Sequence, residues 1–209
     1  FEAVRDTTLE PGEKAETMAW VEEWRGDDVR CRLVVRQFND HKRDDVFSGT
    51  PDGFYTRYLL VLASIHYEDD WVIMIIDVSV AFMHAPIDDK VKVKVPAGIT
   101  SATGYWELLK AINGTRKASQ SWTEWSAKQV CLFPGIRNDY NPEVFLFPEH
   151  KSDGEQHGDD FALAGPRDAI MDLKGKFESH FMCKKIDISG TGPNDEREGG
   201  FLKRKLWVD

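Results

Sequence analysis

The residues of this chain best suited to chemistry are three aspartates in two short segments. Asp77 closes the apolar run Trp71-Val-Ile-Met-Ile-Ile-Asp77, and Asp159 and Asp160 stand together in Gln156-His-Gly-Asp-Asp-Phe161. A carboxylate ending a buried strand could meet two more on a tight turn and bind a divalent metal, because Mg²⁺ takes a few carboxylates and completes its shell with water or phosphate. Taken alone, the residues also allow a solvent-facing strand end and an Asx-type turn.

The elements that must position these aspartates follow from hydrophobic patterning. The apolar run at 71–80 predicts a strand buried on both faces, with Asp77 near its mouth. Residues 54–66 predict a short, mostly buried helix, and residues 161–164 a strand after the Asp-Asp pair. Gly165-Pro166 then opens a predicted helix, since Pro suits a first turn and one apolar stripe follows it, formed by Ile170, Leu173, Phe177 and Phe181.

The segment just before the Asp-Asp pair lacks these signals. Residues 148–156 contain no β-branched residue and are rich in charged ones, so their strand propensity is poor. We therefore expect the first arm of a hairpin carrying Asp159 and Asp160 to be missing, which would leave the two carboxylates poorly aimed at Asp77.

The rest of the chain reads as alternating strands, helices and loops. Residues 1–19 are expected to be a polar lead-in with little order. Helix 116–131 carries Trp122 and Trp125 at helical spacing, which favours core packing. The predicted strands are 28–38, 91–95, 105–109 and 201–208, and the predicted loops are 41–53 and 189–200. This interleaving indicates one mixed arrangement of helices and sheet.

Composition limits the classes of protein to consider. The chain has 209 residues, of which 41% are hydrophobic, which is enough for one large domain or two packed lobes. No apolar stretch reaches the length of a membrane span, and the N-terminus lacks the pattern of a secretory signal. Three widely spaced cysteines predict neither disulfides nor zinc and point to an intracellular compartment. The net charge of −9 argues against a nucleic-acid partner except through local basic clusters.

Six segments, in matching order, resemble the boxes of copia-type retrotransposon reverse transcriptases. Asp77-Val-Ser-Val-Ala-Phe-Met-His84 resembles the first catalytic box of that family, Asp-Val-x-x-Ala-Phe-Leu-His, and His157-Gly-Asp-Asp-Phe161 stands where the family has Tyr-Val-Asp-Asp. The resemblance extends over roughly residues 28–207. The other four segments are residues 30–38, 109–122, 141–145 and 173–182.

The resemblance implies an α+β fold built as the fingers and palm of a right-hand polymerase, without thumb or ribonuclease H domain. A reverse-transcriptase-like domain would follow the lead-in. The implied limits are the lead-in at 1–19, the domain at 20–209, fingers at about 20–53 and 85–118, and palm at about 54–84 and 119–209.

The resemblance also implies roles for individual residues. Asp77 and Asp159 would be bridging ligands of two Mg²⁺ ions, with Mn²⁺ as the alternative, and Asp160 an auxiliary ligand. Phe82 would exclude a 2′-hydroxyl, or else be a plain core aromatic. The implied nucleotide-binding residues are Val78, Phe82, Arg30 and Arg32, and the implied nucleic-acid-binding residues are Arg36, Lys110, Arg116 and Lys117. For the basic residues, a solvated charged surface is the alternative.

The implied reaction is RNA-directed DNA synthesis by two-metal nucleotidyl transfer, with an RNA template, a DNA primer and deoxynucleoside triphosphates as partners. The resemblance further implies a Pol polyprotein with integrase and ribonuclease H, located in a cytoplasmic particle or the nucleus, with neither secretion nor a membrane partner. Processive synthesis by this chain alone is not expected. The divergent segment 148–156 and the altered box around Gly114 leave open an inactive relic, or a nucleic-acid- or protein-binding module. An unrelated Mg²⁺ hydrolase ranks last, because the motifs offer no water-activating base.

Overall fold

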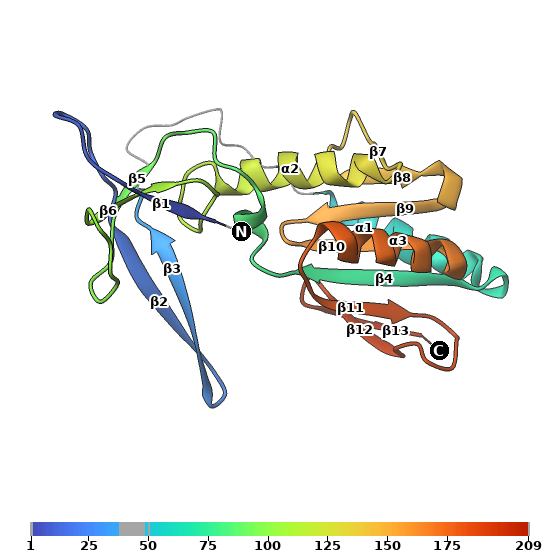
Figure 1. The fold of residues 1–209 in the computed structure, drawn as a ribbon. Helices are drawn as coiled ribbons and strands as arrows, with labels where there is room; N and C mark the ends of the chain where they lie inside the picture. Colours follow the sequence, from blue (N-terminus) through green and yellow to red (C-terminus); the bar gives the residue numbers. More distant parts are fainter. Residues whose placement is uncertain (1, 38–48, 50, 209) are drawn as a thin grey trace. The chain divides into compact units, whose positions relative to one another are not determined.

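The computed structural model describes residues 2–37, 49 and 51–208, and the chain divides into two compact units (Figure 1). Unit 1 comprises residues 1–48 and 81–125, and unit 2 comprises residues 49–80 and 126–209. The predicted boundaries between fingers and palm lie after residues 53, 84 and 118. Which segments are fingers and which are palm stays a prediction.

Unit 1 contains a three-stranded antiparallel sheet and a separate hairpin. The sheet has the order β1-β6-β5, formed by β1 (Val4–Thr7), β6 (Tyr105–Leu108) and β5 (Lys92–Lys94). The hairpin pairs β2 (Met18–Arg25) with β3 (Asp28–Val35). A 3₁₀ turn covers Ala81–His84. The core of the unit consists of Val35, Val91, Val93, Leu108 and Ile112.

Strands β1 and β2 correct the expectation of a lead-in with little order. Val4 packs against the core of unit 1, and β1 pairs with β6 about a hundred residues later in the chain. Order at residues 4–7 therefore depends on a distant partner, which local composition does not reveal. The predicted strand 28–38 ends at Val35, and Phe38 lies outside the described residues. The predicted loop at 41–53 is described only at residues 49 and 51–53.

Unit 2 is built on a six-stranded antiparallel sheet with the order β11-β4-β10-β9-β8-β7. The strand predicted at 71–80 is confirmed as β4 (Trp71–Val78), which ends two residues earlier. The other strands are β7 (Ile136–Arg137), β8 (Val144–Phe147), β9 (Ser152–His157), β10 (Asp160–Pro166) and β11 (Cys183–Ser189). A second small sheet pairs β12 (Glu198–Phe201) with β13 (Arg204–Trp207).

The predicted helices are also confirmed, as α1 (Gly53–Ile65), α2 (Ala118–Leu132) and α3 (Arg167–His180). Helix α2 begins in unit 1 and continues into unit 2. The Asp52 side chain caps α1 by accepting a hydrogen bond from the backbone N–H of Phe54 at 3.1 Å. Pro166 precedes the first residue of α3, where its fixed backbone angle suits helix entry. Short 3₁₀ turns cover Tyr67–Asp69 and Pro148–His150.

Helices α1 and α3 cover opposite faces of the six-stranded sheet. Side chains alternate along a strand, so neighbours in β10 point to different faces. Ala162 and Ala164 pack with Leu59 of α1, whereas the ring of Phe161 lies 5.1 Å from that of Phe177 in α3. Asp77 and Asp160 share the alternation of the residues that face α1. The three aspartates are thus carried on a sheet whose two faces are both packed.

The C-terminal region differs from its prediction because a turn was not visible in the sequence. Residues 201–208 were expected to be one strand, but the chain reverses at Leu202 and Lys203, so Phe201 pairs with Arg204. Leu202 and Lys203 have positive φ angles of 52° and 62°, which Asn and Gly adopt more easily. The predicted loop 189–200 likewise ends within β12.

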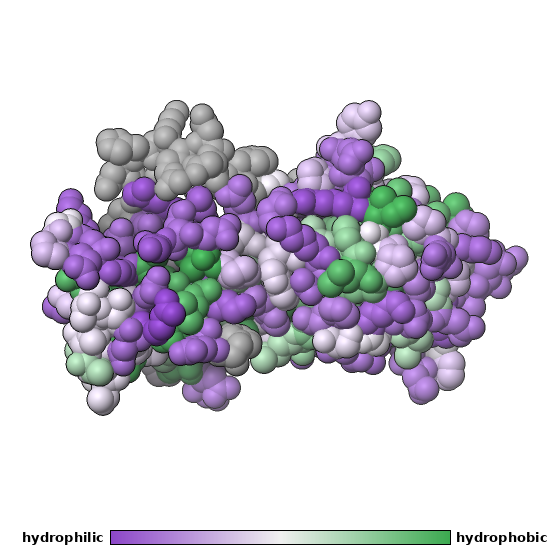
Figure 2. All heavy atoms as spheres, turned by 45° about the horizontal axis from the view of Figure 1, so that its top comes forward, coloured by the Kyte–Doolittle hydropathy of each residue, from purple (hydrophilic) through white to green (hydrophobic). Residues whose placement is uncertain are grey.

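One face of the described surface is largely polar. Figure 2 shows one face on which hydrophilic residues predominate, with smaller groups of hydrophobic residues among them. Within residues 2–37, 49 and 51–208, no helix combines the length and apolar character needed to cross a membrane.

Candidate active site

Asp77 lies at the end of the central strand of unit 2, opposite one of the other two aspartates. In the β4–β10 ladder, Asp77 is the register partner of Asp160, and Ile76 is that of Phe161. Residues directly opposite each other in an antiparallel pair point to the same face, with Cβ atoms about 5 Å apart. Strand pairing therefore brings these two carboxylates together at one end of the β4–β10 ladder.

Asp159 belongs to the turn that joins β9 to β10. His157 pairs with Asp160, so Gly158 and Asp159 form a two-residue hairpin turn. Gly158 has a φ of 64°, which glycine adopts without strain. The backbone N–H of Val78 donates to the carbonyl of Asp159 at 3.2 Å, which ties the turn to the end of β4. The structure thus brings together Asp77, Asp159 and Asp160.

The expectation that one hairpin arm is missing was wrong, because residues 152–157 form β9 between β8 and β10. Side chains of two helices donate hydrogen bonds to its polar side chains. The hydroxyl of Thr56 in α1 donates to Glu155 at 2.6 Å, and the hydroxyl of Tyr58 donates to Asp153 at 2.6 Å. On the other face, Ser126 of α2 donates to the Gln156 amide oxygen at 2.9 Å. Hydrogen bonds to these helices thus stabilise a strand whose sequence lacks the apolar residues of a typical buried strand.

Glu155 is the most deeply buried carboxylate of this arm. Its side chain is 1% exposed, and within the described residues its Oε2 atom has no hydrogen-bond partner. Burial raises the pKa of Glu155, while the hydrogen bond from Thr56 acts in the opposite direction. A raised pKa means that the folded state keeps a proton at pH values where the unfolded state has lost it.

We expect Glu155→Gln to make the protein more stable at neutral pH. Because folding raises the pKa of Glu155, wild-type stability falls as pH increases above about 4.3, where an unfolded Glu ionises. Glutamine keeps an acceptor for Thr56 and cannot ionise, so this contribution to the fall disappears. Urea unfolding at several pH values should show Glu155→Gln to be more stable than wild type at pH 7.5, with the difference shrinking as pH falls toward about 4. Glu149→Gln, at an exposed position, is the control, and equal behaviour of both variants would contradict the prediction.

The three aspartates give the site a negative electrostatic potential. The pKa of Asp160 is raised to about 6, first by burial and then by the charges of Asp159 and Asp77, while Lys184 opposes the shift. Lys184, which the sequence analysis did not single out, donates from Nζ to Asp77 Oδ2 at 2.7 Å. Repulsion among carboxylates that are held together favours a bound cation.

The donor set suits Mg²⁺, although it is not assembled as a finished coordination shell. In the described part of the chain, no group of three His, Cys, Asp or Glu side chains is arranged to hold a metal ion. One oxygen of Asp77 is instead engaged by Lys184. Hard carboxylate oxygens from a strand end and the adjoining turn are the ligands that Mg²⁺ prefers, so the residues fit this ion.

The residues predicted to bind nucleotide are divided between the units. Val78 belongs to unit 2, where its side chain is 1% exposed. Phe82 is half-buried in the 3₁₀ turn of unit 1. Arg30 and Arg32 lie on β3 of unit 1, and Arg32 forms an ion pair with Glu23 at 3.1 Å. These nucleotide-binding roles stay predictions.

The residues predicted to bind nucleic acid all belong to unit 1 and make local contacts there. Lys110 donates to the carbonyl of His84 at 2.9 Å, and Lys117 forms an ion pair with Asp89 at 3.0 Å. The backbone N–H groups of Arg116 and Arg36 donate at 2.8 Å, to Gln37 Oε1 and to the carbonyl of Thr17 respectively. These contacts give both lysines a structural role. They do not test the predicted role in binding nucleic acid.

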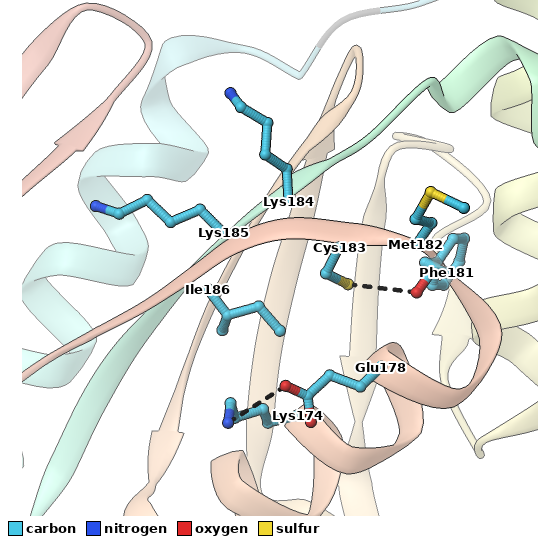
Figure 3. Close-up of a pocket in the computed structure, with 8 residues that line it drawn as sticks. All are labelled: Lys174, Glu178, Phe181, Met182, Cys183, Lys184, Lys185 and Ile186. Atoms are coloured by element: carbon cyan, nitrogen blue, oxygen red, sulfur yellow. Dashed lines mark hydrogen bonds and ion pairs between the residues drawn. The ribbon is translucent and has the colours of Figure 1, made fainter.

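A hollow of about 500 Å³ lies beside β11 and the end of α3 (Figure 3). Two contacts join residues of its lining: Lys174 pairs with Glu178 at 3.3 Å, and the Cys183 thiol donates to the Phe181 carbonyl at 3.7 Å. Burial raises the pKa of Cys183 to about 11, so the thiol stays protonated and is a poor nucleophile.

Comparisons with known proteins agree with this arrangement. A family model described as reverse transcriptase (RNA-dependent DNA polymerase) matches residues 9–188. Among solved structures, the chain is similar to telomerase from Candida albicans in complex with a fragment of telomeric RNA, with 8% sequence identity and a TM-score of 0.52. The match covers 99% of this chain and 46% of that chain, so this chain spans less than half the length of its structural neighbour. No curated protein matches. Together these findings confirm the predicted α+β polymerase fold.

Proposed function

The chain belongs to the reverse transcriptase (RNA-dependent DNA polymerase) family, and from this premise we propose that it is the fingers and palm of a copia-type retrotransposon enzyme. The proposed reaction is RNA-directed DNA synthesis, in which a primer 3′-hydroxyl attacks the α-phosphate of a deoxynucleoside triphosphate. The single observation that carries the proposal is the pairing of Asp77 with Asp160 beside the Asp159 turn.

Each aspartate has a proposed task in this reaction. Asp77 and Asp159 would hold two Mg²⁺ ions, or Mn²⁺, with Asp160 as an auxiliary ligand. When bound, the ions supply activation of the primer hydroxyl and stabilisation of the leaving oxygen. The task of the protein is then to fix the carboxylates, and the ladder between β4 and β10 is suited to this because each strand has a hydrogen-bonded neighbour on both sides.

The proposed substrate contacts come from the remaining predicted residues. Phe82 would lie against the sugar and exclude a 2′-hydroxyl, and Val78 would border the nucleotide. Arg30 and Arg32 would hold the triphosphate, since one guanidinium group can donate two parallel hydrogen bonds to phosphate oxygens. The proposed contacts to the template backbone are Arg36, Lys110, Arg116 and Lys117.

We place this chain within a Pol polyprotein that also supplies integrase and ribonuclease H, inside the cell in a cytoplasmic particle or the nucleus. The copia-like order of boxes between residues 28 and 207 supports this proposal. In that setting the RNA template and DNA primer are the partners.

Primer extension on an RNA template tests the proposal directly. The purified chain is expected to add nucleotides to a labelled DNA primer when Mg²⁺ or Mn²⁺ is present, and to stop when the ion is chelated. An Asp159→Asn variant prepared in parallel controls for contaminating polymerases. Equal extension by the wild type and this variant would refute the proposal.

A second candidate is a binding module that no longer catalyses. It is favoured by the absence of a preassembled metal group among the described residues and by the ion pair between Lys184 and Asp77. This module would bind an RNA–DNA duplex with an affinity that decreases as salt increases, without extending a primer. Binding measured at about 50 mM salt, together with no extension in either metal, would select this candidate.

A further inference from the structure

Strand β11 contains an irregularity beside Asp77. In its ladder with β4, Cys183 pairs with Val78 and Lys185 pairs with Asp77, so Lys184 is an extra residue between two regular pairs. Such a bulge breaks the alternation of side chains and can re-aim one of them. Figure 3 shows the result, with Lys184 and Lys185 on one side of the strand and Cys183 and Ile186 on the other.

The bulge directs two consecutive lysines toward one face, but only Lys184 contacts a predicted metal ligand. Its Nζ lies 2.7 Å from Asp77 Oδ2, whereas Lys185 Nζ lies 2.6 Å from Asp187 Oδ2. Both lysines are largely exposed, with side-chain exposures of 57% and 69%. The two lysines have similar exposure but different partners.

We propose that Lys184 is a built-in counter-cation that occupies the Asp77 side of the metal site and competes with a divalent ion for this carboxylate. An oxygen that accepts a hydrogen bond from an ammonium group is not available, with the same lone pair, for direct coordination. Coordination of a divalent ion through this lone pair of Asp77 Oδ2 therefore requires the Lys184 side chain to swing away. Its exposure leaves room for that movement, because a solvent-exposed ion pair is weak and readily exchanged.

The inference rests on the proposed function only in taking Asp77 as a metal ligand. It concerns affinity for the ion and not the chemical step. Because Lys184 also neutralises Asp77 when no metal is bound, it should limit repulsion among the three aspartates in the metal-free protein. Removing Lys184 should therefore strengthen metal binding and weaken the metal-free fold.

The test is Mn²⁺ binding, followed by the loss of the electron paramagnetic resonance signal of free Mn²⁺ on titration. Lys184→Met is expected to lower the dissociation constant about fivefold, the scale of an exposed ion pair. Lys185→Met is the matched control, because it removes the same charge from the next residue and should change the constant by less than about twofold. Lys184→Arg, which keeps a cation, should stay close to wild type.

The same variants give a second reading in thermal unfolding. Mn²⁺ should raise the melting temperature of Lys184→Met by more than that of wild type, because a ligand that binds the folded state stabilises it according to its affinity. Without metal, Lys184→Met should melt below wild type.

Equal or weaker Mn²⁺ binding by Lys184→Met, or an equal gain in Lys185→Met, would overturn the inference. If Asp77→Asn abolishes Mn²⁺ binding and wild type extends a primer, that outcome leaves the proposed function standing. If no protein in the series shows binding that depends on Asp77, both the inference and the metal chemistry of the proposed function are overturned.

Discussion

An Asp77→Asn variant is expected to lose at least about a thousandfold in the rate of RNA-templated primer extension, or about 4 kcal/mol of transition-state stabilisation. Asparagine keeps the size of the side chain and its place opposite Asp160, but it removes the charge that a divalent ion needs. Because Asp77 is one of the two aspartates that would hold both metal ions, and lies on a strand paired on both sides, we expect its loss to be the most severe of the three aspartates.

Asp187→Asn is the matched control for this measurement. Asp187 lies on neighbouring β11, pairs with Lys185, and has no proposed part in the reaction, yet its replacement changes the net charge equally. Both variants should unfold cooperatively without metal, which separates lost chemistry from lost structure. Retention of more than about a tenth of the wild-type rate by Asp77→Asn would contradict the proposed role.

A Gly114→Ala variant is expected to lower the free energy of unfolding of unit 1 by about 3 kcal/mol or more. Gly114 has a φ of 88°, and an added Cβ atom would lie 2.0 Å from the carbonyl oxygen of Val35. This backbone is fixed, since the N–H of Val35 donates to the carbonyl of Asn113 at 2.8 Å and Val35 is part of the core. In the variant, the backbone at residue 114 must therefore move away from Val35 at the end of β3.

Gly98→Ala separates the clash from backbone strain. Gly98 has nearly the same φ, 87°, but nothing lies within 4 Å of its added Cβ atom. Its replacement should cost only about 1–2 kcal/mol, the strain of a left-handed residue. Urea unfolding gives both values, and hydrogen exchange of the Val35 amide should accelerate in Gly114→Ala alone. Similar costs for the two variants would show that the close approach is not maintained.

The elements with a clear apolar rhythm could be predicted from the sequence. Strand β4, helix α1 and helix α3 bury residues at the spacing of their own secondary structure, so each is visible locally. Asp77 and Asp160 were assigned to one site through the resemblance to copia-type reverse transcriptases, because the residues alone also allowed a solvent-facing strand end and an Asx-type turn.

The missed elements depend on partners that are distant in the chain. Strand β9 is polar, and its stability comes from hydroxyl groups of α1 and α2 that the local sequence does not reveal. Strand β1 depends on β6 in the same way. Lys184 was missed because a bulge is a property of the ladder; the consecutive lysines before Ile186-Asp-Ile188 were its one available signal.

The strand order β11-β4-β10 has a consequence for biosynthesis. Both neighbours of β4 are encoded far downstream, and the nearer of them, β10, begins about eighty residues after β4 ends. At a synthesis rate of roughly 5–20 residues per second, β4 waits for several seconds with neither edge paired. During that time the segment Trp71-Val-Ile-Met-Ile-Ile76 exposes apolar, strand-forming residues without charge or proline, which is the composition of an aggregation-prone stretch. The strand that carries Asp77 is therefore also a stretch through which a nascent chain is prone to aggregate.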